Sequence, residues 1–393
     1  MSSSTAPLTV TEFSGAAMLT DIAALVNIES PSRDLGQLAI HADAIAQLMT
    51  THLGHAPTLI ASDVGPHIHW SGGGDPHVLI LGHHDTVHPV GTLQEFPFST
   101  DNDIASGPGI FDMKTGIVQA IYAVGALMKH NSALAQHVEI LLTADEEIGS
   151  HASRALLEDR ARAAGAVLVL EPSADGGALK IGRKGTGTFV IHVTGRASHA
   201  GLEPEKGINA LVEMAGLIPQ IVALADVDQG TTVTPTLASA GTADNVVPEH
   251  ATCSVDVRVQ NMTEKNRIET ALSQLRTQHP EAHISVTGAI TRPPMHRSAG
   301  EALMNVAREV GATLGIHVLD GVEVGGGSDG NFTAACGVHT LDGLGAVGAG
   351  AHTLKEQVVI SSLPERAALI AGLCQRLCSI DKMPPLSSVP ADR

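Results

Sequence analysis

Hydrophobic and polar positions in the first part of the chain follow two alternating patterns. Apolar residues recur at helical spacing in 12–28, 35–52, 115–130 and 150–163, and short apolar runs occupy 78–81, 138–142 and 167–170. Short apolar runs that alternate with helices are typical of parallel strands whose two faces are both covered. This part of the sequence therefore predicts an α/β domain with a mostly parallel sheet.

A different order of elements begins at about residue 185. The pattern predicts strands at 186–194, 231–239, 251–260 and 283–287 and helices at 207–225 and 264–278. This β-α-β-β-α-β order is that of a ferredoxin-like unit. The α/β pattern then resumes with a helix at 300–314, a strand at 338–341 and a helix at 363–380. We therefore predict a small domain, 185–294, inserted into a larger discontinuous domain made of 1–184 and 295–393.

The composition and net charge of the chain exclude some classes of binding partner. Of the 393 residues, 43% are hydrophobic but only 2% are aromatic, and the formal net charge is -18. A surface this negative repels phosphate backbones and anionic lipids, so we expect neither nucleic acid nor a membrane as partner. Residues 1–10 lack the features of a signal peptide, and no stretch reaches the roughly 18 apolar residues of a membrane span. We expect a cytoplasmic protein with a disordered tail after Met383.

Residues that follow the predicted strands are unusually uniform in chemical type. In open α/β sheets, ligands bind outside the carboxyl ends of the strands, and histidines and carboxylates occupy those positions here. With an aspartate that precedes a helix, the segments are 82–87, 109–114, 143–147, 171–172 and 350–352, and they contain His83, His84, Asp85, Asp112, Asp145, Glu146, Glu147, Glu171 and His352. Several neighbouring carboxylates disfavour one another's ionised forms unless a cation lies among them. The pattern therefore indicates a metal site.

Imidazoles mixed with carboxylates suit zinc, and less specifically manganese or cobalt. Two ions about 3.5–4 Å apart require a bridging carboxylate, and water between them loses a proton near neutral pH. A further carboxylate outside the ligand set would then act as general base. Each motif alone has a plainer explanation, because His-x-Asp arises by chance and Glu146–Glu147 could be a solvated helix start. Only their combination at predicted strand ends indicates a two-metal hydrolase.

These motifs resemble those of the di-zinc aminoacylase and carboxypeptidase family, most closely its glutamate carboxypeptidase branch, which includes folate-hydrolysing enzymes. The resemblance covers about 21–371 and includes further segments at 195–201, 245–248, 255–258 and 325–329. It implies an amide hydrolase with two zinc ions per chain, for which cobalt or manganese could substitute. It also implies that the inserted domain is the lid and dimerisation domain of a homodimer.

The resemblance assigns a role to each residue of the metal site. The implied ligands form two groups that share one bridging carboxylate: His83 and Glu171 for one ion, Glu147 and His352 for the other, and Asp112 between them. Asp85 would orient His83 from outside the ligand set. Glu146 would be the general base that passes a proton from water to the leaving amine. His84 departs from the family pattern, which often has a smaller residue at that position.

Substrate contacts are implied mainly in the inserted domain. The resemblance places its histidine, here His199, in the active site of the partner subunit to stabilise the tetrahedral oxyanion. It places an arginine, here Arg292, on the terminal carboxylate of the substrate, and Arg258 near the end of a predicted strand could share this task because guanidinium pairs with carboxylate in a bidentate manner. Asn245, in a matching segment, is a further expected substrate-binding residue.

The expected substrate is a small molecule or short peptide with a free carboxylate. Cleavage of its amide bond would release a C-terminal amino acid, as in a glutamate carboxypeptidase. Because the motifs are shared within the family, hydrolysis of N-acyl amino acids by an aminoacylase or deacylase on the same site is the alternative.

Two other motifs suggest different functions. Residues 326–330 fit the Gly-x-Ser-x-Gly elbow of a serine hydrolase, with Ser328 as nucleophile and Asp342 and His352 in the right order. The short segment between Ser328 and His352 argues against it, since that fold normally places further strands there. Residues 343–348 match a dinucleotide fingerprint, but no convincing helix follows them. A catalytically inactive scaffold protein would have lost a ligand or the base, and all are present.

Overall fold

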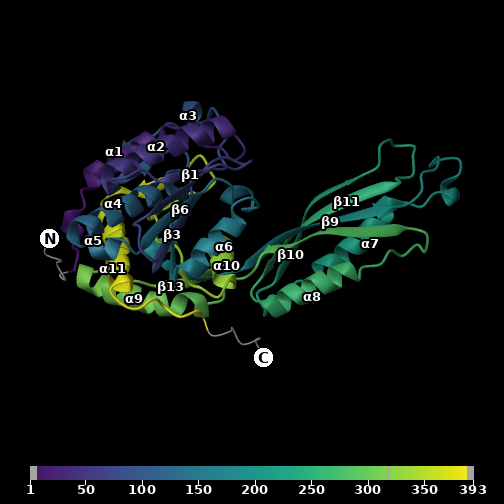
Figure 1. Ribbon diagram of the computed structural model, residues 1–393. Helices are drawn as coiled ribbons and strands as arrows, with labels where there is room; N and C mark the ends of the chain where they lie inside the picture. The colour runs from purple at the N-terminus through teal and green to yellow at the C-terminus, as the bar shows by residue number, and fades with distance from the viewer. Residues whose placement is uncertain (1–6, 317, 387–393) are drawn as a thin grey trace. The chain divides into compact units, whose positions relative to one another are not determined.

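A six-stranded sheet lies at the centre of the first of two units into which the chain divides (Figure 1). The computed structural model describes residues 7–316 and 318–386. The first unit contains the chain up to Gly182, His296–Val324 and the described chain from Ser328 on, and the second contains Arg183–Met295 and Gly325–Gly327. The inserted domain was expected at 185–294. Its expected start is two residues after Arg183, where the main segment of the second unit begins, and its expected end is one residue before Met295, where that segment ends.

The central sheet is mainly parallel, as the sequence predicts. Its strands run in the order β1 (Thr58–Ile60), β2 (His67–Ser71), β6 (Val138–Thr143), β3 (Val78–His83), β7 (Ala166–Val169) and β14 (His339–Leu341). β3 pairs in parallel with β6 and β7, and β14 pairs in parallel with β7. β2 and β1 extend the sheet in the antiparallel sense. The carboxyl end of β3 therefore lies between those of β6 and β7.

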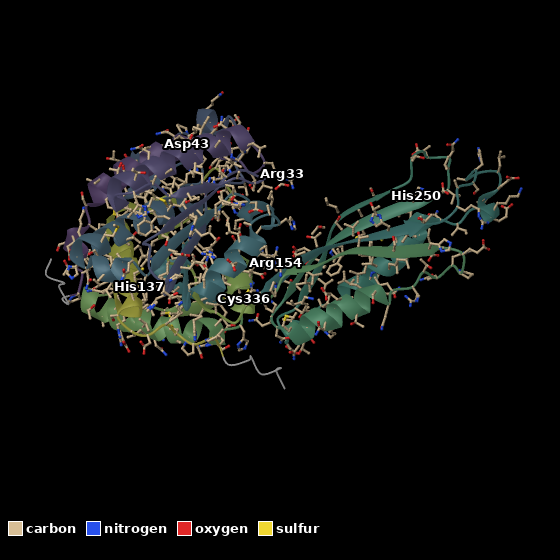
Figure 2. The ribbon with its side chains drawn as sticks, in the orientation of Figure 1. Arg33, Asp43, His137, Arg154, His250 and Cys336 are labelled. Carbon is tan, nitrogen blue, oxygen red and sulfur yellow. The ribbon has the colours of Figure 1, made fainter. Side chains whose placement is uncertain are left out.

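Hydrophobic side chains cover both faces of this sheet. The face that bears Val78 and Ile80 shares a core with α1 (Gly15–Val26), α2 (Leu35–Leu53), α4 (Thr115–His130), α9 (Ser298–Leu314) and α11 (Leu363–Cys378). The face that bears Leu79 and Leu81 packs against α6 (Arg154–Ala163) and α10 (Gly330–Ala335). This alternation follows from the two-residue period of a strand. The helices expose polar side chains, such as Asp43 on α2 and Arg154 on α6 (Figure 2).

One apolar segment corrects an expectation from the sequence. Ile110–His130 is, by length and composition, apolar enough to cross a membrane, whereas no such segment was expected. However, 89% of its apolar window is buried inside the structure, where α4 packs against α2 and α11. A helix enclosed by a protein core is apolar on all sides. The composition of this segment is therefore explained by its position in the core.

The second unit is an antiparallel sheet with two helices. The strand order is β10 (Thr232–Ala240), β11 (His250–Val259), β9 (Gly185–Thr194) and β12 (His283–Arg292). One hydrophobic core joins this sheet to α7 (Ala210–Val222) and α8 (Met262–Ser273). Asn209 and Asn261 cap the two helices, because their side chains accept hydrogen bonds from backbone N–H groups of the first turn. The β-α-β-β-α-β order predicted from the sequence is present.

Short elements account for most of what the hydrophobic pattern misses. They are β4 (Ser99–Asp101), β5 (Ile104–Ser106), β15 (Gly348–Ala349) and β16 (Gln357–Val359), which form one small sheet, β8 (Leu179–Arg183) with β13 (Gly321–Val324), and the helices α3 (Thr92–Glu95) and α5 (Ser132–Ala135). The helix expected from 150 begins at Arg154. Of the tail after Met383, Leu386 N donates to Gly337 O at 2.8 Å, and residues 387–393 lie outside the described residues.

Candidate metal centre

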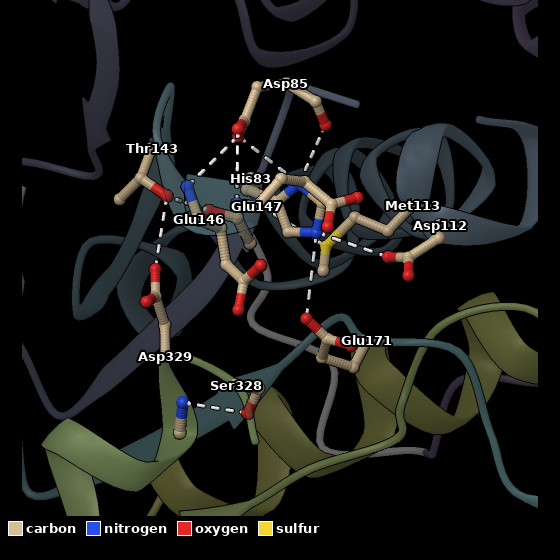
Figure 3. Close-up of polar contacts among 12 residues, drawn as sticks. His83, Asp85, Asp112, Met113, Thr143, Glu146, Glu147, Glu171, Ser328 and Asp329 are labelled. Carbon is tan, nitrogen blue, oxygen red and sulfur yellow. Dashed lines mark hydrogen bonds and ion pairs between the residues drawn. The ribbon is translucent and has the colours of Figure 1, made fainter. Parts of the chain in front are cut away.

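His83 and several carboxylates gather at the carboxyl ends of the central strands (Figure 3). His83 is the last residue of β3, Glu146 and Glu147 lie in the loop after β6, and Glu171 follows β7. Because β3 is parallel to both neighbours, these positions meet at one edge of the sheet. The sheet topology therefore brings together residues that are far apart in the sequence.

Asp112 and His352 reach this edge from two loops. Asp112 lies in Ile110–Lys114, an irregular turn that precedes α4 and follows Gly109, whose φ is 70°. His352 lies in the turn between β15 and β16. Its backbone φ is 64°, and its side chain is 51% exposed. His83, by contrast, ends a buried strand and is 1% exposed.

Asp112 stands between the two histidines. Its Oδ1 lies 3.2 Å from His83 Nε2, and its Oδ2 lies 3.3 Å from His352 Nε2. Glu171 Oε1 is 3.7 Å from His83 Nε2, and Glu147 Oε2 is 3.2 Å from His352 Nε2. The contacts thus form two groups, each with one histidine and one glutamate, joined by one carboxylate. This is the grouping that the family resemblance implies for two ions with a bridging ligand.

The donor atoms fit metal ions. Imidazole nitrogen and carboxylate oxygen are ligands that zinc takes in proteins. Glu147 Oε1 is buried and has no hydrogen-bond partner among the described residues, so it retains acceptor capacity for a cation. Ligand atoms of His83, Asp112 and Glu147 lie within 4.8 Å of one another, and so do those of His83, Glu146 and Glu171. Glu146 is therefore as close as the ligands, and its separate role as base rests on the resemblance.

The surroundings of the two histidines favour their protonated forms when no ion is bound. Hydrogen bonds with Asp112 and Glu147 raise the pKa of His352 to about 11. Burial lowers the pKa of His83, but hydrogen bonds with Asp112 and Asp85 outweigh burial and raise this pKa well above its ordinary value. Burial raises the pKa of Asp112, but hydrogen bonds with His352 and His83 hold it well below its ordinary value. A metal ion would therefore have to displace protons from both imidazoles.

Asp85 fixes the loop that carries Glu146 and Glu147. Its buried carboxylate accepts hydrogen bonds from Glu146 N at 3.2 Å, Glu147 N at 3.3 Å and Ser32 Oγ at 2.7 Å. His83 Nδ1 lies 2.9 Å from the Asp85 backbone oxygen and 3.5 Å from Asp85 Oδ1. A histidine held at Nδ1 in this way directs its Nε2 lone pair toward the centre. The sequence predicts the contact with His83 but gives no signal for the part played by Ser32.

A second buried carboxylate braces the same loop. Asp329 accepts hydrogen bonds from Thr143 Oγ1 at 3.2 Å and from Ser150 Oγ. Thr143 is the last residue of β6, and Ser150 has a φ of 56° near the end of the loop. Asp329 thus binds residues on both sides of Glu146 and Glu147 and holds the two ends of this loop together. Its sequence motif, 325–329, is recognisable, but its contact with this loop is not.

Comparison with known proteins agrees with this geometry. Residues 79–376 match the peptidase family M20/M25/M40. The chain belongs to this family. It is therefore a metallopeptidase of the M20 type, and the family resemblance inferred from the motifs is confirmed.

Two relatives and one solved structure show the range of the similarity. Carboxypeptidase G2 from Pseudomonas sp. (strain RS-16) is 32% identical over 92% of this chain and 89% of that protein. Succinyl-diaminopimelate desuccinylase from Xanthomonas oryzae pv. oryzae (strain PXO99A) is 28% identical over 78% of this chain and 85% of that protein. A dinuclear metal-binding peptidase of the M20 family from Bacillus subtilis has the same fold, with a TM-score of 0.66 and 15% identity over 93% of this chain and 98% of that chain.

His84, which departs from the family pattern, makes its contacts outside the candidate metal centre of this M20 peptidase. Its Nε2 lies 2.8 Å from Pro66 O, and its Nδ1 lies 3.5 Å from His41 Nδ1. Burial lowers the pKa of His84 to about 4. The ring is therefore neutral and supports the loop after β3, while the neighbouring His83 contacts Asp112.

The serine hydrolase alternative is wrong. Ser328 is fully buried, and its Oγ donates directly to Asp342 Oδ2 at 2.6 Å. In a triad the histidine stands between the serine and the aspartate, whereas His352 contacts Asp112 and Glu147.

The dinucleotide fingerprint at 343–348 has a structural explanation. This segment joins β14 to β15 and opens no helix. The buried guanidinium of Arg366 donates to the backbone oxygens of Gly343, Gly345 at 2.9 Å and Gly177 at 3.0 Å. Gly345 N in turn donates at 2.9 Å to the backbone oxygen of Glu171. The glycines therefore let the chain pass close to the strand end that carries Glu171, a predicted metal ligand.

The remaining predicted site residues belong to the second unit. His199 is exposed, and its Nδ1 accepts hydrogen bonds from Gly201 N and Leu202 N, both at 3.1 Å. The neutral ring therefore carries its proton on Nε2. Asn245 is also exposed, and its backbone oxygen accepts from Ala200 N at 2.9 Å, beside His199.

The two arginines predicted to bind substrate, Arg258 and Arg292, both belong to this unit. Arg258 forms a bidentate ion pair with Asp256 on the same strand, with both nitrogen–oxygen distances 2.9 Å. Arg292 is the last residue of β12 and is 8% exposed. Because Arg258 is paired with Asp256, it would have to break this ion pair before it could bind a substrate carboxylate.

Proposed function

We propose that this M20 peptidase cleaves an amide bond and releases a C-terminal amino acid with a free carboxylate, as a glutamate carboxypeptidase does. The observation that carries the proposal is the position of Asp112 between a His83–Glu171 group and a His352–Glu147 group. The 32% identity to carboxypeptidase G2 supports the carboxypeptidase assignment.

Two ions, which we propose to be zinc with cobalt or manganese as substitutes, would polarise the scissile carbonyl and acidify a water molecule. Glu146 would accept the proton of that water and deliver it to the leaving amine. Glu146 is 7% exposed, and its backbone nitrogen donates a hydrogen bond to Asp85. A base held in this way can face the reacting atoms without moving the loop.

His199 would stabilise the oxyanion. Because Gly201 N and Leu202 N occupy its Nδ1, the neutral ring offers an Nε2–H donor. A donor with a fixed tautomer needs no proton rearrangement when negative charge develops on the carbonyl oxygen. We propose that the protein is a homodimer and that each His199 serves the active site of the other subunit.

Arg292 is the stronger candidate for binding the terminal carboxylate, because the family resemblance assigns that role to the arginine at its position. Asn245, whose backbone oxygen accepts a hydrogen bond from the residue after His199, is a further candidate for contact with the substrate. Arg292→Lys should lower kcat/KM strongly for a free-acid substrate and much less for its amide, because lysine cannot reproduce the bidentate fork. Arg258→Lys is the matched comparison. Equal losses on acid and amide would remove carboxylate recognition from the role of Arg292.

A substrate panel tests the whole proposal. Zinc-loaded protein is assayed against N-acyl and N-peptidyl amino acids that vary independently in acyl group and C-terminal residue. We expect kcat/KM to depend mainly on the C-terminal residue and to be highest for glutamate. The similarity to succinyl-diaminopimelate desuccinylase supports a second candidate, an N-acyl hydrolase, for which the acyl group would decide the rate. Absence of amide hydrolysis across the panel would contradict both.

A further inference from the structure

Glu356 lies in the same turn as His352 but points into the protein. It is 1% exposed, whereas the His352 side chain is 51% exposed. Glu356 Oε2 accepts hydrogen bonds from Gly109 N and from His88 Nε2, the latter at 3.2 Å. A buried carboxylate that makes such contacts is held in one place, because its charge is costly to bury without donors.

Both partners of Glu356 belong to segments that carry metal-site residues. Gly109 is the residue before the turn Ile110–Lys114, which contains Asp112. His88 lies in the loop that leaves β3 just after His83. Glu356 therefore connects three segments, and each contributes one residue to the contact His83–Asp112–His352 described above.

Backbone and charge contacts strengthen this connection. Glu356 N donates to Thr353 O at 3.3 Å within the turn, and its backbone oxygen accepts from Gly107 N at 3.4 Å. The buried ammonium of Lys114 is attracted by Glu356 and donates to Ile28 O at 2.8 Å. The turn of His352 and the segment of Asp112 are thus joined by side-chain and main-chain contacts at the same point.

We infer that Glu356 is a positioning residue that holds His352 against Asp112 and so sets the affinity of one of the two metal sites. The inference rests on the proposed two-ion centre. His83 is placed by the end of a buried strand, but His352 sits on an exposed turn with a left-handed backbone. The turn therefore needs an anchor, and Glu356 supplies one that reaches the Asp112 segment directly.

Stepwise Co²⁺ titration of metal-free protein tests this inference. The variants are Glu356→Ala, which removes both hydrogen bonds, and Glu356→Gln, which keeps an acceptor oxygen but removes the charge. Glu309→Gln on the exposed side of α9 is the matched control. His352→Ala marks the binding step that depends on the His352 site.

We expect Glu356→Ala to weaken that step by roughly 10–100-fold, the usual effect of removing a residue that orients a metal ligand. Glu356→Gln should weaken it less, since a charged acceptor makes the stronger hydrogen bond. The other step should weaken less in both variants, because His83 stays fixed by the end of the buried strand β3. The thermal midpoint of each metal-free variant verifies folding, and Glu356→Gln serves as the test if Glu356→Ala does not fold.

Equal weakening of both steps, or no weakening of either, would overturn the positioning role. The proposed two-ion centre would fail differently, because wild-type protein itself would then bind fewer than two Co²⁺ ions. Both outcomes are measured by Co²⁺ binding and do not depend on substrate or turnover. Failure of the positioning role can therefore be distinguished from failure of the two-ion centre.

Discussion

Asp112 is the residue on which both halves of the centre depend. Its two oxygens contact different histidines, at 3.2 Å and 3.3 Å, so neither half is complete without it. In the metal-free protein its negative charge is balanced by protons on the imidazoles. Proton and metal occupancy of the site are therefore linked.

This linkage predicts proton release on metal binding. The pKa of His352 is raised to about 11 and that of His83 is also raised, so both rings are protonated at neutral pH without metal. Filling both sites should release about two protons, and metal affinity should fall as pH falls because protons then compete more strongly. Calorimetric Zn²⁺ titration in two buffers of different ionisation enthalpy measures the number. Binding enthalpies that do not depend on the buffer would contradict the linkage.

Glu146 and Glu147 are neighbours with different predicted roles. Glu146→Gln should lower kcat by about 10²–10⁴-fold, the usual contribution of general acid–base catalysis, while two metal ions stay bound. Glu147→Gln is the matched variant and should lose metal, because its Oε2 contacts His352 at 3.2 Å. Elemental analysis of both purified variants distinguishes the roles. Metal loss from Glu146→Gln would make Glu146 a ligand instead.

At the scale of elements, buried strands were the most predictable part of the fold. β3, β6 and β7 are covered on both faces, so their sequences are continuous apolar runs that a sequence pattern reveals. β2 contains two histidines and a tryptophan and was not predicted, because its character as a strand comes from pairing with β6. β15 and β16 are likewise fixed by neighbours rather than by their own sequence.

The site was predictable to the same extent as the strands. Parallel topology alone brings the ends of β3, β6 and β7 together, so His83, Glu147 and Glu171 follow from the pattern. The supporting contacts do not follow. Glu356 and Asp329 act through loops whose paths depend on tertiary packing, and no local sequence period reports which backbone N–H or hydroxyl a buried carboxylate will meet.

The structural surroundings of Ser328 show that its Gly-x-Ser-x-Gly motif is not a nucleophile elbow. Ser328 precedes α10, where its Oγ donates to Asp342 and accepts from Gly330 N at 3.1 Å. Ser328→Ala should therefore lower the free energy of unfolding by about 1–3 kcal/mol, the cost of leaving a buried acceptor unpaired, and should change kcat little. Chemical denaturation and steady-state kinetics measure the two effects. A fall in kcat of about 10⁶-fold, as expected for loss of a nucleophilic serine, would contradict the metal-dependent assignment.

At the scale of the whole molecule, the second unit carries surface suited to a partner. On α7, Leu211, Val212 and Val222 are exposed by 50%, 61% and 47%, and Leu237 on the edge strand β10 is exposed by 72%. Apolar side chains on an edge strand and the helix beside it favour association with another protein surface. These exposures support the proposed homodimer.

The homodimer proposal makes a test of His199 possible, because it places His199 and Glu146 of one active site on different subunits. His199→Ala and Glu146→Gln should each be inactive as homodimers. In a heterodimer of the two variants, one site combines wild-type Glu146 of one subunit with wild-type His199 of the other, and the second site lacks both. Differently tagged, co-expressed subunits purified as the heterodimer should then regain about half of the wild-type kcat per dimer, since one of two symmetric sites is intact. Metal content of both homodimers should be unchanged, because neither residue is assigned as a ligand. A verified heterodimer without activity would show that His199 acts within its own chain or takes no part in the reaction.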